Sequence, residues 1–214
     1  MSLFLLVLGV RGCCVPHPTA RLDPLVLLTP RLLLRPYEAA DAPVFFNLLA
    51  QSRIRLELSF PDRLQAVPTL AHAPAQLAAF ARDWRTGRFY VFGIWHRESS
   101  AYLGDICLMP QQAGQAEIGY YLAPEAEGQG YAREALGAIV SFGFGPARAT
   151  RLLIRCFADN VRGQAVAQSQ GFALKAPSLP VGFWPRLRRG LRRLPPEPEI
   201  LYFMRYAPPH QAIG

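Results

Sequence analysis

Residues able to hold a phosphate gather in the stretch Gly128-Gln-Gly-Tyr-Ala132, which follows a strand-like run and opens a helical pattern. The glycines at 128 and 130 let the backbone approach a bound group closely. The N–H groups of Gln129 to Ala132 fall in the first helical turn, where they have no partner inside the helix and carry the positive end of its dipole. This arrangement is typical of an anion site. The alternative for a lone Gly-x-Gly in this place is a tight strand-to-helix turn that binds nothing.

Two nucleotide-binding motifs do not fit this loop. A P-loop requires Gly-Lys-Ser/Thr, which the chain lacks. A dinucleotide fold requires a third glycine in Gly-x-Gly-x-x-Gly and places the loop in the first βαβ unit, whereas this loop follows a series of strands. The spacing therefore favours a different phosphate-bearing ligand.

The length and hydropathy of the chain predict one domain. A chain of 214 residues with 51% hydrophobic residues can fill one core but is short for two. We expect an N-terminal extension at 1–24, a domain at 25–208 with a basic insertion at 181–196, and a C-terminal tail at 209–214.

Hydrophobic periodicity predicts a mixed α+β sheet within this domain. Runs of strand type occur at 31–36, 89–96, 102–109, 117–122, 152–157, from Phe172 and at 199–206. Helical patterns begin at Asp41, an N-cap followed by Pro43, at Pro74, near residue 129 and at Asn160. The stretch between the first two helices, with prolines at 61, 68 and 74, is expected to be a loop. The strands within 89–122 predict an antiparallel meander, and the strand–helix–strand unit that follows favours parallel pairing.

The positive charge of the chain is largely local. The net charge is +8, but residues 186–193 contain five arginines and no acid, and the rest of the chain carries +3. Leu187, Leu191 and Leu194 follow a helical spacing there, which predicts a short basic amphipathic helix over Arg186–Arg193. Such a helix suits ribosomal RNA, an acidic protein acceptor or an anionic membrane surface. The alternative is a solvated insertion that packs its leucines on the sheet.

The cysteines and the N-terminal residues indicate where in the cell the protein is expected. The four cysteines follow neither a zinc-site nor a disulfide spacing, so we expect reduced thiols in a cytoplasmic protein. The apolar run at residues 1–10 is far shorter than the roughly 20 residues of a membrane span. Its first basic residue, Arg11, follows the run instead of preceding it as in a signal peptide. Neither a membrane span nor secretion is expected.

Several segments, in the right order and at the right distances, resemble the GNAT family of N-acetyltransferases, and within it the RimJ/RimL type that acetylates ribosomal proteins at their N-termini. They are Thr29-Pro-Arg-Leu-Leu-Leu-Arg-Pro36, Gly104-Asp-Ile106, Glu117-Ile-Gly-Tyr-Tyr-Leu-Ala-Pro124, Gly128-Gln-Gly-Tyr-Ala-Arg-Glu-Ala135, and Asp159-Asn160 followed by Gly171-Phe172. The resemblance extends from about Leu28 to Tyr206.

The resemblance implies a GNAT fold that binds acetyl-coenzyme A, as a monomer or a homodimer. The strand at 117–122 would diverge from the strand at 152–157, and the pantetheine arm would bind between them against backbone groups near Leu122, like an added strand. The residues that would contact the rest of the cofactor are Gly128, Gln129, Gly130, Tyr131 and Ala132 at the pyrophosphate, and Asn160 from the other side.

Two features depart from the family pattern. The loop usually begins with Arg or Gln, whereas here it begins with Glu127, whose side chain we expect to turn away to solvent. Gly163 stands where this branch often carries a serine, and Ala167 where many relatives carry a tyrosine acid. The usual groups that protonate the leaving thiolate are therefore missing.

The resemblance also implies a direct reaction, in which an amine attacks the acetyl thioester. The protein must then position both reactants and accept a proton from the ammonium group. Glu117 matches a glutamate that is the base in some relatives; the alternative is a solvated residue at a strand end. Glu57, in a segment that resembles the acceptor-site wall, is a second candidate. His72 and His96 are expected to be polar residues before a helix and at a strand end.

Several aromatic residues fit either an acceptor pocket or the core. For Trp84, Phe89, Tyr90 and Trp95 the core is favoured. Tyr120 and Tyr121 alternate along one strand, so one should face the core and the other the cleft. The sequence does not say which.

Together these observations predict an enzyme that transfers the acetyl group of acetyl-coenzyme A to a primary amine, with a protein N-terminal α-amine as the leading acceptor. A small amine, such as an antibiotic or a polyamine, is the second possibility. A third is a catalytically decayed acetyl-coenzyme A-binding module, which Glu127, Gly163 and Ala167 support.

Overall fold

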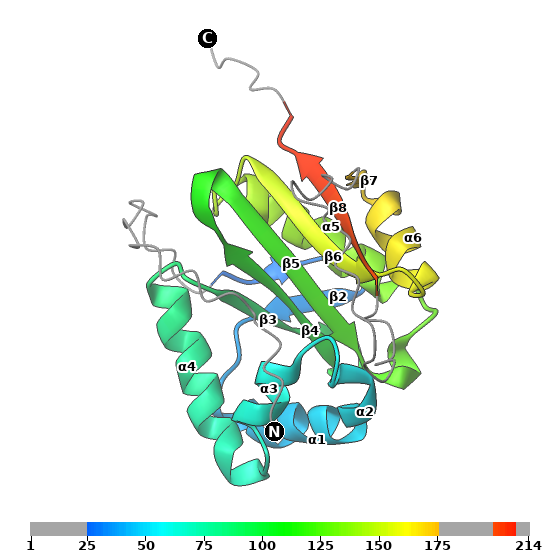
Figure 1. Cartoon of the computed structure of the whole chain (residues 1–214). Coiled ribbons are helices and arrows are strands. Elements are labelled where there is room, and N and C mark those ends of the chain that lie inside the picture. The colour runs from blue at the N-terminus through cyan, green and yellow to red at the C-terminus, as the bar shows by residue number, and fades with distance from the viewer. Residues whose placement is uncertain (1–24, 176–198, 209–214) are drawn as a thin grey trace, which may run out of the picture.

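The computed structural model describes residues 25–175 and 199–208, and its centre is one mixed sheet of eight strands (Figure 1). The strands are β1 (Leu27–Leu28), β2 (Leu32–Arg35), β3 (Tyr90–His96), β4 (Tyr102–Pro110), β5 (Gln115–Leu122), β6 (Arg151–Phe157), β7 (Ala173–Leu174) and β8 (Ile200–Tyr206). Their order in the sheet is β1-β2-β3-β4-β5-β6-β8-β7. All neighbours pair antiparallel except β5 and β6, which are parallel as predicted.

Six α-helices and four short 3-10 turns complete the described part of the chain. The α-helices are α1 (Ala42–Gln51), α2 (Arg53–Leu56), α3 (Pro61–Ala66), α4 (Ala73–Arg85), α5 (Tyr131–Phe144) and α6 (Val161–Ser169). The 3-10 turns are η1 (Ala39–Asp41), η2 (Leu70–His72), η3 (Gln112–Gly114) and η4 (Pro124–Ala126). Within residues 25–175 and 199–208, none of the helices has the length and hydropathy that crossing a bilayer requires.

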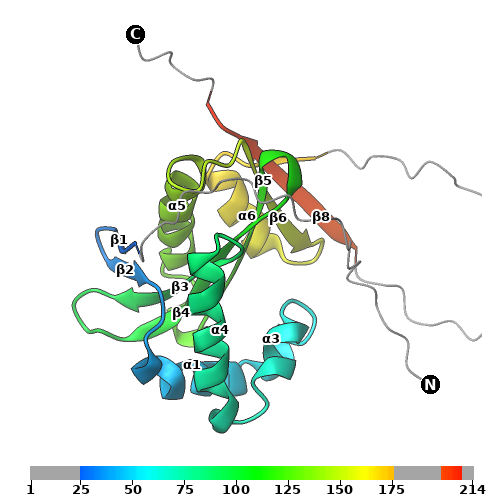
Figure 2. The ribbon, with the colours of Figure 1, turned by 90° about the vertical axis from the view of Figure 1, so that its left-hand side faces the viewer.

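The two faces of the sheet are covered by different helices. Figure 1 shows α5 behind the strands and α3 in front of them, and the quarter turn of Figure 2 places these helices on opposite sides. On the α5 face, Phe142 packs against Tyr90 and Phe92 at ring distances of 5.1 and 5.2 Å. On the α3 face, Phe60 packs against Tyr121 at 5.2 Å. Strand alternation therefore sends even- and odd-numbered residues of β5 into different layers.

The central opening of the fold is a break in the pairing of β5 with β6. The parallel register runs from Gln115↔Arg151 to Ile118↔Ile154 and then stops. Beyond that point β5 stays with β4 as far as Gly104↔Leu122, and β6 stays with β8 as far as Phe157↔Ile200. Each strand is thus held by its outer neighbour while the two diverge. We call this opening, from Gly119 onward on β5 and Arg155 onward on β6, the β5–β6 split.

Three local predictions were wrong. The proline-containing stretch expected to be a loop contains α2 and α3, because Pro61 sits in a first helical turn, where its missing N–H costs nothing. A two-residue strand, β1, precedes the predicted first strand. Asp41 stands before α1, but its carboxylate does not cap that helix. It accepts instead from the Glu38 N–H at 2.7 Å and from Arg35 at 2.8 and 2.9 Å.

A buried ion pair joins α3 to the centre of the sheet. Nη1 of Arg63 donates to the Asp105 carboxylate, at 2.6 Å from Oδ1, and these side chains are 6% and 0% exposed. Tyr37 Oη donates to Asp105 Oδ2 at 3.1 Å and lies 2.5 Å from Tyr102 Oη. Burial, and next the Asp105 charge, raise the pKa of both tyrosines, so they remain protonated. The pair fixes α3 beside β5, because Asp105 lies opposite Tyr121 in the sheet.

Breaking this pair should be far more damaging than removing both of its charges. Arg63→Met leaves the Asp105 carboxylate buried without its cation, and we expect a loss of about 3–5 kcal/mol in the free energy of unfolding. The double variant Arg63→Met/Asp105→Asn removes both charges and keeps an acceptor for Tyr37, so it should regain at least half of that loss. Urea unfolding of the two single variants and the double variant measures the coupling; simple additivity of the single losses would contradict it.

Candidate functional site

The loop before α5 presents a row of free backbone N–H groups. Gly128 and Gly130 have φ angles of +75° and +81°, a left-handed conformation that glycine adopts without strain. The helix begins at Tyr131, two residues later than predicted, and its first backbone hydrogen bond runs from the Glu134 N–H to the Gly130 carbonyl at 3.1 Å. Among the described residues, none accepts from the amides of Gly128 to Arg133. A Cβ on Gly128 would meet nothing within 4 Å, so the space beside this row is open.

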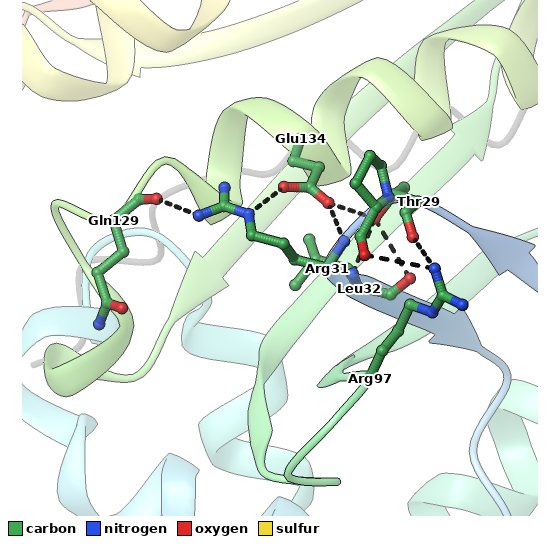
Figure 3. A network of polar contacts seen from close by, with 7 residues as sticks. Thr29, Arg31, Leu32, Arg97, Gln129 and Glu134 are labelled. Carbon is green, nitrogen blue, oxygen red and sulfur yellow. Dashed lines mark hydrogen bonds and ion pairs between the residues drawn. The ribbon is translucent and has the colours of Figure 1, made fainter.

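A polar network fastens this loop to the turn between β1 and β2 (Figure 3). The Glu134 carboxylate accepts from Thr29 Oγ1 at 2.6 Å, from the Arg31 N–H at 2.8 Å and from Arg31 Nε at 2.8 Å. Arg31 Nη1 donates to the Gln129 carbonyl at 3.0 Å, and the guanidinium lies 4.6 Å from the ring centre of Tyr131. Arg97 Nη1 holds the same turn by donating to the Thr29 carbonyl at 2.8 Å. These contacts hold the free N–H groups in place without using any of them.

The network also changes the acidity of Glu134. Partial burial alone would raise its pKa, but the hydrogen bonds from Thr29 and Arg31 outweigh burial and lower the pKa below its ordinary value of 4.5. The Glu134 carboxylate is therefore ionised, and it holds the Arg31 guanidinium group against the start of α5.

Backbone groups of β5 line the β5–β6 split. The Ala123 N–H donates to Leu103 on the β4 side at 2.8 Å. Because backbone groups of successive strand residues point to opposite sides, those of Leu122 and Tyr120 are directed toward the split. A ligand lying there can pair with them as an added strand would.

Asn160 stands on the other side of the split, as the N-cap of α6. Its Oδ1 accepts from the Gly163 N–H at 2.9 Å, so half of the side-chain amide is committed to the helix. The Nδ2 group has no acceptor within the described part of the chain and remains able to donate. Gly163 is tightly surrounded, since a Cβ there would lie 2.8 Å from Asn160 Nδ2 and 2.9 Å from Cys156 Sγ. The serine that is frequent in the RimJ/RimL branch would need this corner to shift.

The two neighbouring tyrosines of β5 serve different layers. Tyr121 is 7% exposed and lies on the α3 face, beside the Phe60 ring and the Arg63 guanidinium group. Tyr120 is partly buried on the α5 face, and burial, then the nearby Cys156 thiol, raise its pKa. Tyr120 is thus the one that faces β6 across the split.

Glu117 lies one residue before the last paired position of β5, on the same face as Tyr121. Its carboxylate accepts from Arg155 Nε at 2.5 Å and from Gln111 Nε2 at 2.9 Å. Glu57 follows α2 and is exposed. The structure therefore places Glu117 close to the start of the split and Glu57 on the surface of the helical segment in front of it.

The prediction that the Glu127 side chain turns away to solvent was wrong. The carboxylate forms ion pairs with Arg55 of α2 and, at 3.4 Å, with Arg162 of α6. Its side chain is 31% exposed, while those of the two arginines are 50% and 85% exposed. Arg55 and Arg162 were not among the predicted site residues. They are 72 and 35 residues away from Glu127 in the sequence, and no local sequence pattern indicates that these side chains come into contact.

Most of the aromatic residues considered for an acceptor pocket belong to the core. Trp84, Tyr90 and Trp95 are 2%, 1% and 6% exposed, and Trp84 packs against Tyr90 and Phe92. Phe89 is partly buried against the same core. His96 ends β3 and His72 precedes α4, as predicted. The basic segment Arg186–Arg193 lies outside the described residues.

Comparisons with known proteins agree with this architecture. Residues 31–173 match the model of a family described as the acetyltransferase (GNAT) domain. The uncharacterized N-acetyltransferase YoaA of Bacillus subtilis is 27% identical over 149 residues, which cover 69% of this chain and 82% of that protein. The structure of a putative ribosomal-protein-serine acetyltransferase from Vibrio cholerae has a TM-score of 0.61 and 26% identity, covering 86% of this chain and 98% of the other. RimL, a ribosomal L7/L12 α-N-protein acetyltransferase in complex with coenzyme A, has a TM-score of 0.68 and 18% identity, covering 85% and 98% of the two chains.

The chain belongs to the GNAT acetyltransferase family, and its sheet with flanking helices is the GNAT fold. It is an acetyl-coenzyme A-dependent N-acetyltransferase. The residues present suit that cosubstrate: the split offers unpaired backbone to an extended arm, and the open space beside Gly128 offers free N–H groups to a phosphate. When bound, the cosubstrate supplies the activated acetyl group.

The Arg31–Glu134 anchor should contribute measurably to stability. Glu134→Gln keeps the size of the side chain but leaves three donors with one good acceptor, so we expect the free energy of unfolding at pH 7 to fall by about 1–3 kcal/mol. Urea unfolding measures the loss, and Glu98→Gln, in an exposed turn, is the matched control and should change little.

The contribution of Glu134 should depend on pH in a fixed direction. The pKa of Glu134 is lower in the folded than in the unfolded state. Its contribution to the free energy of unfolding is therefore complete above pH 4.5 and is lost as the pH falls through the pKa of the folded state. The stability difference between the wild type and Glu134→Gln should therefore shrink below pH 4.5. A difference that stays constant from pH 7 down to pH 3 would contradict this assignment.

Proposed function

We propose that this enzyme is of the RimJ/RimL type and acetylates the N-terminal α-amine of a protein. The observation that carries the proposal is the position of α2 and α3, which stand beside the β5–β6 split through the Phe60–Tyr121 and Arg55–Glu127 contacts. The same helical segment carries two exposed apolar side chains, Ile54 and Leu58, which are 87% and 69% exposed. Apolar surface of this kind suits the first residues of a polypeptide chain.

The charges of this segment favour a peptide over a polycation. Residues 53–63 contain three arginines and two acids, so the wall beside the split has no acidic excess. A polyamine or an aminoglycoside would be bound by clustered carboxylates. The similarity to the Vibrio cholerae protein, whose name refers to ribosomal-protein serine, points in the same direction.

We assign the cofactor contacts to the groups described above. In this assignment the amides around Gly128, Gln129, Gly130, Tyr131 and Ala132 hold the pyrophosphate, the backbone of Leu122 pairs with the pantetheine arm, and the free Nδ2 of Asn160 donates to it from across the split. In direct attack the amine forms the new C–N bond as the thioester C–S bond breaks. One proton of the ammonium group goes to the base, the other is released to solvent, and the leaving thiolate takes up a proton from solvent.

We assign the general base to Glu117, with Glu57 as the alternative. Glu117 is supported by its place at the start of the split, on the face that α2 and α3 cover. Its ion pair with Arg155 holds the carboxylate in one position. A water molecule between this carboxylate and the amine would complete the path of the proton.

A peptide and amine panel tests the proposed acceptor. The purified protein is incubated with acetyl-coenzyme A and each acceptor, while free thiol and acceptor mass are followed. Acetylation of a peptide at its N-terminus, with no transfer to the same peptide blocked by an N-terminal formyl group, is the expected result. Transfer only to small amines would support the alternative acceptor class. Cofactor binding without transfer to any acceptor would support the decayed module.

The base assignment predicts opposite behaviour for two matched variants. Glu117→Gln should lower kcat by about 100-fold, the usual size of a general-base contribution, while leaving the Kd of coenzyme A within about twofold. Glu57→Gln removes the same charge from the exposed end of α2 and should leave kcat nearly unchanged. Steady-state kinetics together with calorimetric titration of coenzyme A decide between them; a large loss for Glu57→Gln alone would transfer the role to Glu57.

A further inference from the structure

Glu127 links three separate elements at the mouth of the β5–β6 split. Its carboxylate is held by Arg55 from α2, on the side of the helical segment, and by Arg162 from the first turn of α6, across the split. Glu127 directly precedes Gly128, where the free N–H groups and the open space begin. Two arginines and one carboxylate therefore occupy the border of the region assigned to the cofactor's phosphates.

These ion pairs are easily exchanged. The side chains of Arg55 and Arg162 are 50% and 85% exposed and that of Glu127 is 31% exposed, and ion pairs open to solvent contribute little to stability. A pyrophosphate carries more negative charge than a carboxylate and offers more oxygens to the planar fork of a guanidinium group. Arginines held loosely by Glu127 would therefore gain from moving to a phosphate that arrives next to them.

A carboxylate in this position also acts against the ligand. Its charge repels a phosphate bound to the neighbouring amides, and it keeps the two guanidinium groups engaged.

We propose that Glu127 is an internal competitor of the cofactor's pyrophosphate, and that Arg55 and Arg162 move from Glu127 to the phosphates when acetyl-coenzyme A binds. This inference rests on the proposed cofactor site at Gly128–Ala132. The transfer sets the affinity for the cofactor through an exchange of ion pairs. It also frees α2 from its contact with the loop at the moment when the cofactor arrives, which couples cofactor binding to the segment that faces the acceptor.

The test is a thermodynamic cycle on cofactor affinity. Calorimetric titration with coenzyme A is carried out on the wild type, Glu127→Gln, Arg55→Ala/Arg162→Ala and the triple variant. We expect Glu127→Gln to tighten binding by about fivefold and the double arginine variant to weaken it by about tenfold, in line with the strength of charge-assisted hydrogen bonds to phosphate. In the background without the two arginines, the gain from Glu127→Gln should be smaller, because only the direct repulsion of the phosphate by Glu127 is then relieved.

Matched controls come from the same segments. Glu125→Gln removes the same charge two residues upstream, and Arg53→Ala removes a cation from the same helix as Arg55; both residues are exposed, and both changes should leave the Kd within about twofold. Pantetheine, which has the arm but no phosphate, should bind the wild type and Glu127→Gln equally. Thermal unfolding verifies that each variant is folded, and Glu127→Ala serves as a second substitution at the same position.

The outcomes separate this inference from the proposed function. Weaker or unchanged coenzyme A binding by Glu127→Gln would overturn the competitor role, while leaving the cofactor site in place. An equal gain with and without the arginines would overturn the transfer, because repulsion alone would then explain the effect of Glu127. A wild-type protein that does not bind coenzyme A would overturn the proposed cofactor site and this inference together.

Discussion

The parallel pairing of β5 and β6 ends at Ile118 and Ile154, and the rest of the site is arranged around that break. The two strands can diverge because each has a second neighbour along its full length, β4 for β5 and β8 for β6. The backbone groups of β5 and β6 that no longer pair with each other beyond this point remain available to a ligand. The result is an opening lined by main chain, in which an extended molecule can be bound largely independently of side-chain identity.

The loop at the mouth of this opening keeps its shape through contacts made elsewhere. Arg31 and Glu134 lie 103 residues apart in the chain, and their pairing holds the Gln129 carbonyl and the first turn of α5 while the N–H groups of the loop stay free. The buried Arg63–Asp105 pair performs a similar task on the other face, where it fixes α3 against the strand that carries Tyr121. Both sides of the split are thus positioned by ion pairs that a bound cofactor would not have to break. The ion pairs of Glu127 differ, since they are exposed and lie where the cofactor is expected.

Much of the fold was predictable because it follows from periodicity and glycine placement. The strands from β2 to β6, the parallel pair around α5 and the start of α6 at Asn160 all follow patterns of short range. The loop at Gly128–Ala132 was predictable for the same reason, since its left-handed glycines and its helix belong to one continuous stretch. The helices α2 and α3 were missed because each is only a turn or two long, and prolines in first turns resemble prolines in loops.

The sequence by itself determined the family, through its resemblance to GNAT proteins. It also determined the glycine loop before α5, the antiparallel meander and the parallel strand pair that follows, because these depend on residues that are near one another in the chain. Only the tertiary structure decided which tyrosine of the pair at 120 and 121 faces β6, that Asp41 bonds Arg35 instead of capping α1, and that Glu127 is held between Arg55 and Arg162. These outcomes depend on charges and surfaces brought together from distant parts of the chain. Coulombic attraction and burial depend on how far apart two groups are in the folded protein, and the spacing of residues along one strand or helix does not reveal that distance.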